Sequence, residues 1–66
     1  MDMAKARFEV LRPYCEGVRQ FLNRLQFSES DVTWTETGGF IYREFILRGP
    51  VPVVKGALAS LRTYLN

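Results

Sequence analysis

The chain contains no histidine and only one cysteine, Cys15. Without histidine, the Ser–His and Cys–His pairs that activate nucleophiles are not available. The imidazole ligand common in zinc and other transition-metal sites is missing too, and a single thiol cannot form an internal disulfide. We therefore predict that the protein is not an enzyme, and we expect no catalytic residue, metal, cofactor or small-molecule substrate.

Long apolar segments are also missing. No stretch approaches the roughly 18 consecutive apolar residues that a membrane-spanning helix needs. Charged residues (Asp2, Lys5 and Arg7) occur at the start of the chain, where a signal peptide has its apolar segment. A lone cysteine fits a reducing compartment. We expect a soluble, cytoplasmic protein that does not bind membranes.

Charge of one sign is not concentrated anywhere. The net charge is +2, and nine basic and seven acidic residues are spread along the whole chain. Nucleic-acid-binding domains usually gather their basic residues on one face. The charge pattern therefore favours a mixed, solvated surface over a nucleic-acid-binding one.

Apolar residues are plentiful for so short a chain: 47% of the 66 residues are hydrophobic and 14% are aromatic. We expect a single domain over residues 1–66. A domain of this size buries only about 60% of its unfolded surface, and many such domains need a disulfide, a metal or a second subunit. Because the composition argues against the first two, it favours oligomerisation.

Residues 3–26 follow the spacing of an amphipathic helix. The apolar residues recur four, three, four, three, four and three positions apart: Ala4, Phe8, Leu11, Cys15, Val18, Leu22 and Leu25. Pro13 interrupts this segment because proline lacks an amide hydrogen and disfavours helical geometry at the preceding residue. Since the spacing keeps its phase, we predict one long helix kinked at Pro13. The alternative is two helices, the second beginning at Pro13. In either case Cys15 is expected to be a buried, inert thiol.

Residues 32–37 alternate β-branched or aromatic residues with polar ones, which predicts a strand. Gly38-Gly39 suits a two-residue turn, because both positions can take positive φ. A second strand is expected from residue 40 to about 48. Two prolines then end the sheet, and Pro52 begins a helix that reaches Leu65. The predicted fold class is α+β: a long N-terminal helix, an antiparallel β-hairpin and a C-terminal helix (αββα), with both helices packed on one face of the hairpin.

The turn determines which side chains of the hairpin are buried. A two-residue turn at Gly38-Gly39 pairs Trp34 with Arg43 and gathers a suitable core face: Val32, Trp34, Glu36, Ile41, Arg43, Phe45 and Leu47. The other face then collects Thr33, Thr35, Thr37, Phe40, Tyr42, Glu44 and Ile46. A three-residue loop would exchange the faces of the second strand, because a one-residue slip reverses every side chain. We favour the first register.

In either register, three large apolar residues of the second strand face away from the helices. Contiguous apolar patches on small proteins usually mark contact surfaces, and a two-stranded sheet with open edges is marginal alone. We therefore expect a small protein–protein interaction or assembly module that binds another protein or forms a homo-oligomer, most simply a homodimer through the β-hairpin. The predicted interaction residues are Thr35, Phe40, Tyr42 and Ile46. The alternative is a small nucleic-acid-binding regulator that uses the basic residues beside the sheet, Arg43, Arg48 and Lys55.

Overall fold

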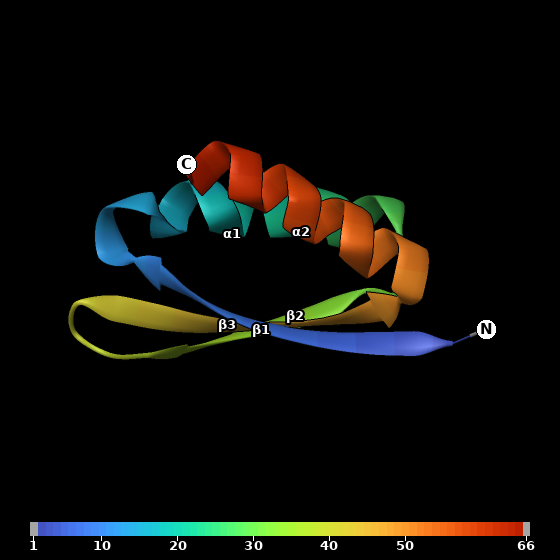
Figure 1. The fold of residues 1–66 in the computed structure, drawn as a ribbon, viewed down its shortest axis with the longest axis horizontal. Helices are drawn as coiled ribbons and strands as arrows, with labels where there is room; N and C mark the ends of the chain where they lie inside the picture. Colours follow the sequence, from blue (N-terminus) through green and yellow to red (C-terminus); the bar gives the residue numbers. More distant parts are fainter. Residues whose placement is uncertain (1, 66) are drawn as a thin grey trace.

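The computed structural model describes residues 2–65 as three strands and two helices on one side of them (Figure 1). In chain order the elements are β1 (Met3–Leu11), the short 3-10 helix η1 (Arg12–Tyr14), α1 (Cys15–Ser28), β2 (Thr33–Gly38), β3 (Tyr42–Pro50) and α2 (Val51–Leu65). The strand order is β1-β3-β2, and both pairs are antiparallel. The α+β class and the placement of the helices on one face are confirmed, but the predicted order of elements is wrong.

The first half of the predicted N-terminal helix is a strand. Residues 3–11 form β1, which pairs with β3 along its whole length. Four small or apolar residues alternate with outward-facing ones, so the segment also has the two-residue period of a half-buried strand: Ala4, Ala6, Phe8 and Val10. Pro13 lies in η1, and α1 begins two residues later at Cys15. The segment becomes a strand because it completes a three-stranded sheet, whereas the hairpin alone would be marginal.

The sheet contains a split β-α-β unit. Since β1 and β2 are each antiparallel to β3, they run parallel to each other, with α1 connecting them and β3 between them. The second strand of the hairpin is thus the centre of the sheet. The open edges belong to β1 and β2.

The hairpin turn lies at Phe40-Ile41 and not at the two glycines. Gly38 pairs with Arg43, and the Gly39 amide donates to the Tyr42 carbonyl at 2.9 Å. Neither glycine has a positive φ. The Arg43 guanidinium occupies the place where a Cβ on Gly38 would lie, so a side chain at this position would displace the end of the Arg43 side chain. Ile41, predicted for the core face, is exposed in the turn.

Apart from Phe40 and Ile41, which lie in the turn, the hairpin residues lie on the predicted faces. Trp34 pairs with Leu47 instead of Arg43, a shift of four positions, and an even shift leaves every side chain on its face. The three-residue loop is therefore excluded. Phe45 lies at the centre of the core, where its ring stacks on Phe8 at 5.7 Å and contacts Trp34 at 6.1 Å between centroids.

The core fills the space between the sheet and the two helices. Its buried members come from β1, β3, both helices and Val32, the residue before β2. They are Val10, Cys15, Val18, Leu22, Val32, Phe45, Leu47, Val54, Ala57 and Leu61. The predicted burial of Cys15 is confirmed, as is the C-terminal helix, which begins one residue before Pro52. Among residues 2–65, neither helix is long and apolar enough to cross a membrane.

Candidate protein-interaction surface

The side of the sheet opposite the helices presents a broad surface, which we call the open face (Figure 1). Strand alternation directs one set of side chains from each strand to this side. From β1 these are Met3, Lys5, Arg7, Glu9 and Leu11, from β3 Tyr42, Glu44, Ile46 and Arg48, and from β2 Thr33, Thr35 and Thr37.

The strand register arranges these residues in rows across the sheet. Lys5, Arg48 and Thr33 form one row, Arg7, Ile46 and Thr35 the next, and Glu9, Glu44 and Thr37 a third. Leu11 and Tyr42 form a fourth row beside the hairpin turn. Charge therefore changes sign along the face, from a basic end to an acidic row, and an apolar row follows. Arg7 Nε lies 3.6 Å from Glu44 Oε2 across two adjacent rows.

Three of the four predicted interaction residues share this face. Thr35 and Ile46 are cross-strand neighbours in its central row, and Tyr42 lies at its apolar end with half of its surface exposed. Phe40 is exposed in the turn instead, where the Arg12 guanidinium carbon lies 5.5 Å from the centre of its ring. The structure thus brings together Thr35, Tyr42 and Ile46, with Phe40 beyond the end of the sheet.

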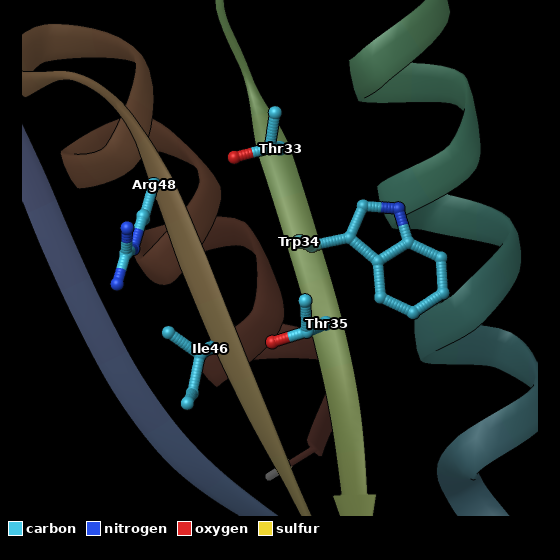
Figure 2. A pocket seen from close by; sticks show the side chains of 5 residues that line it. All are labelled: Thr33, Trp34, Thr35, Ile46 and Arg48. Atoms are coloured by element: carbon cyan, nitrogen blue, oxygen red, sulfur yellow. The ribbon is translucent and has the colours of Figure 1, made fainter.

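A shallow hollow on the open face lies between β2 and β3. Figure 2 shows Thr33, Thr35, Ile46 and Arg48 along these strands, whereas the Trp34 ring points toward α1. The hollow has a volume of about 240 Å³. This is smaller than the ~300–1,000 Å³ of typical ligand pockets, and the hollow is shallow and lined by Thr33, Trp34, Thr35, Ile46 and Arg48. The hollow suits a protruding side chain of a protein partner better than a small molecule.

The three basic residues of the nucleic-acid alternative are not brought together. Arg43 lies on the helix-facing side of β3 and binds Glu36, and Lys55 is an exposed residue of α2. Arg48 alone belongs to the open face, where it neighbours Lys5.

Glu36 of β2 joins the hairpin to α1. Its carboxylate accepts two hydrogen bonds from Arg19, at 2.6 Å from Nε and 2.7 Å from Nη2, and a third from Arg43 Nε. The Arg19 bonds, and secondly the Arg43 bond, outweigh the effect of burial and lower the pKa of Glu36 to about 2. The hydrogen bonds between Arg19 and Glu36 also raise the pKa of Arg19. This cluster has its partners within the chain and fixes the edge of the sheet under α1.

Sequence reasoning missed the contribution of β1 to the open face. Lys5, Arg7, Glu9 and Leu11 had been assigned to a helix, where they would not line up with hairpin residues. The signal that could have found them is the alternation of Ala4, Ala6, Phe8 and Val10 with charged residues.

Within residues 2–65, no cluster of three or more cysteine, aspartate and glutamate side chains is placed to hold a metal ion. In the same part of the chain, no buried side-chain nitrogen or oxygen lacks a hydrogen-bond partner. Comparison of the chain with protein-family models, with curated proteins and with solved structures gave no match.

Proposed function

We propose that the protein is a non-enzymatic protein–protein interaction module that binds a second copy of itself through the open face of its sheet. The observation that supports this proposal is the order of residue types along that face. A basic row and an acidic row lie on opposite sides of the central row, with an apolar residue or row beyond each. When the face is reversed, each of these rows meets its complement, and Arg7 in the central row is the only charged residue that meets its own counterpart.

The complementarity follows from a two-fold axis. We place this axis midway between two stacked sheets and perpendicular to the strands. It runs directly above the central row of Arg7, Ile46 and Thr35. It turns each row onto the row that lies equally far on the other side. Arg48 then faces Glu44 of the second copy, and Lys5 faces Glu9. The same operation places Met3 over Leu11 and each Ile46 over its counterpart, within the ordinary geometry of stacked sheets.

The two kinds of contact have different roles. Solvated ion pairs contribute only about 0–1 kcal/mol each, so Arg48–Glu44 and Lys5–Glu9 mainly set orientation and select the partner. The affinity comes from apolar area removed from water at Ile46, Tyr42 and Leu11, at roughly 25 cal/mol per Å². Self-association also gives a 66-residue domain the extra burial that small domains need.

Mass in solution tests the proposal. Multi-angle light scattering is expected to show an oligomer for the wild type and half of the wild-type mass for Tyr42→Glu and Ile46→Glu. Tyr64→Glu is the matched control, because Tyr64 lies on α2 and is 55% exposed against 50% for Tyr42. This control is expected to keep the wild-type mass. A wild-type mass for both open-face variants, or a monomeric wild type at about millimolar concentration, would contradict the proposal.

A second candidate function is nucleic-acid binding at the basic end of the open face. The observation that favours it is the row in which Lys5 and Arg48 are neighbours, with Arg7 next to them. Binding of a plain oligonucleotide is then expected to weaken steeply with salt and with Arg48→Gln. If neither single-stranded nor duplex oligonucleotide binds at low salt, this candidate is removed.

A further inference from the structure

The free edge of β1 carries a row of backbone groups that have no partner among residues 2–65. The Arg12 amide donates to the Ile41 carbonyl at 3.0 Å, and the Val51 amide donates to the Asp2 carbonyl at 3.2 Å. These bonds show that the backbone amide and carbonyl groups of the even-numbered residues of β1 point toward β3. In an antiparallel pair, the backbone groups of every second residue point away from the partner strand. The amide and carbonyl groups of the odd-numbered residues from Met3 to Glu9 are therefore directed outward in the plane of the sheet.

This edge differs from the other edge of the sheet. β1 is nine residues long, contains no proline and pairs with β3 without a bulge. Proteins usually protect an exposed edge of this kind or use it to pair with another chain. β2 has only six residues and lies beside α1, because the Trp34 ring points toward α1 and Glu36 binds Arg19 (Figure 2). The β1 edge is the better site for an added strand.

We propose that β1 pairs with β1 of a second copy, antiparallel and centred on Arg7, to form a continuous six-stranded sheet. On the helix side, this register places Ala6 opposite Phe8 and Ala4 opposite Val10 of the other copy. These positions are the non-hydrogen-bonded pairs, in which side chains approach most closely. Each large side chain therefore meets a small one.

The other side of the paired strands is also complementary. Lys5 lies opposite Glu9 of the second copy, and Met3 lies opposite Leu11. Arg7 lies on the two-fold axis and meets its counterpart, but Glu44 of the same chain is 3.6 Å from it and offsets its charge. Opposite charges on facing strands stabilise a pair, whereas like charges destabilise it.

The neighbouring registers are less favourable. Moving the axis to Ala6 places Lys5 opposite Arg7, which sets like charges against each other. Moving it to Phe8 sets two Phe8 rings together on the axis and places Lys5 opposite Leu11. The register centred on Arg7 avoids the second conflict and leaves a single like-charged pair, Arg7 with its counterpart, beside which Glu44 lies.

A groove of about 390 Å³ runs beside β1 and α2, with an apolar lining of Phe8, Leu58, Leu61 and Leu65 that is bordered by Arg7, Glu9 and Arg62. A second β1 strand laid along the edge covers this groove and removes its apolar lining from water. All four helices of the pair then lie on one side, and the two open faces join into one surface. This edge contact is independent of the stacking of open faces, and both together would give a tetramer.

Amide hydrogen exchange measured by NMR on the full chain tests the pairing. The amides of Lys5, Arg7 and Glu9 are expected to exchange at least about tenfold more slowly in the concentrated protein than after dilution. Ala6 and Phe8 serve as internal references, because their amides bond to β3 in every folded state. In a mixture of labelled and unlabelled chains, a contact between the α-hydrogens of Ala6 and Phe8 of different copies is expected. Unprotected Lys5, Arg7 and Glu9 amides beside protected Ala6 and Phe8 amides would overturn the proposal.

A backbone variant separates this contact from the open-face contact. Chemical ligation between Tyr14 and Cys15 allows an N-methyl group on the Arg7 amide, which points away from β3 and keeps its side chain. This change is expected to abolish the protection of Lys5 and Glu9 and to halve the mass. An N-methyl group on the Glu36 amide, which points outward at the β2 edge, is the control and is expected to leave both unchanged.

The result for Ile46→Glu completes the separation, because Ile46 lies on β3 and does not reach the edge. Protection of the β1 edge in this variant supports edge pairing even if the open face does not stack. If Ile46→Glu loses the oligomer and the β1 edge amides of the wild-type oligomer are unprotected, the chains associate by stacking alone. This result overturns edge pairing.

Discussion

Arg19 of α1 donates two hydrogen bonds, of 2.6 Å and 2.7 Å, to the Glu36 carboxylate of β2. Arg43 of β3 binds the same carboxylate. One side chain thus links the first helix to both strands of the hairpin, and it does so beside the open edge of β2. A bidentate guanidinium–carboxylate pair is stronger and more directional than a single ion pair. The cluster therefore controls how the hairpin is held under α1.

The first prediction concerns Glu36→Gln and pH. The pKa of Glu36 is about 2 in the folded protein against an ordinary 4.5, so the carboxylate stabilises the fold fully above about pH 4.5. That stabilisation is lost as the pH falls from 4.5 to 2. Arg19 is 42% exposed, so solvent screening reduces the effect, and we expect Glu36→Gln to lower the free energy of unfolding at pH 7 by about 1–2 kcal/mol.

Urea unfolding at a series of pH values measures this effect. The wild-type curve is expected to approach the Glu36→Gln curve between pH 4.5 and pH 2. Glu29→Gln, the same change at an exposed carboxylate, is expected to follow the wild type throughout. A constant difference between wild type and Glu36→Gln down to pH 2 would refute the role assigned to this carboxylate.

The second prediction concerns the centre of the core. Phe45 is fully buried between Phe8 and Trp34, and Phe45→Ala is expected to cost about 3–5 kcal/mol. Small domains have only about 5 kcal/mol in total, so much of the variant should be unfolded at room temperature. Phe27→Ala removes a ring that is 94% exposed and is expected to change stability by less than about 0.5 kcal/mol. Circular dichroism melting curves distinguish the two, and similar curves would be inconsistent with this core.

The third prediction compares two glycines that respond in opposite directions. A Cβ on Gly49 would lie 2.9 Å from Val32 Cγ2 and 3.5 Å from Val32 Cα, and Val32 is fully buried. Gly49→Ala is therefore expected to destabilise the fold by about 1–3 kcal/mol. Around Gly56, in α2, no atom lies within 4 Å of an added Cβ, so Gly56→Ala is expected to stabilise the helix by about 0.5–1 kcal/mol. Melting temperatures that shift in the same direction would contradict the packing described at one of the two sites.

The sequence of the N-terminal segment supports two structures at once. Ala4, Phe8 and Leu11 fit a helical face, while Ala4, Ala6 and Phe8 fit one face of a strand. Local spacing could not decide between them, because the deciding interaction is pairing with β3, more than thirty residues away. Pro13 was the local clue, since it marks the end of β1 and not a kink within a helix.

The hairpin was more predictable because each strand face depends only on whether the register shift is odd or even. Val32, Phe45 and Leu47 were assigned to the core although the turn was placed two residues too early. The glycines at 38 and 39 suggested the turn, but Gly38 lies in β2, where it pairs with Arg43 of β3. Sequence alone therefore found Thr35, Tyr42 and Ile46 on one face, and it could not find their neighbours on β1.

The central claim is that the open face binds the open face of a second copy, related to it by a two-fold axis. Exchanging the charges of Arg48 and Glu44 tests this claim most directly. Both residues lie on β3, in the middle of the sheet, and they do not face each other in the proposed edge pairing. In the stacked pair, Arg48 of each copy faces Glu44 of the other. Arg48→Glu alone therefore sets two acidic groups against each other, and Glu44→Arg alone sets two basic groups against each other.

Sedimentation equilibrium or native mass spectrometry of the two variants, separately and mixed, is the deciding measurement. Each variant alone is expected to show at least about tenfold weaker association through the open face, because like charges oppose each other twice in every pair. The equimolar mixture is expected to associate through the open face in a one-to-one ratio, and the double variant in one chain is expected to recover self-association. Separate variants that associate as tightly as the wild type, or a mixture that associates no more tightly than its components, would contradict the account.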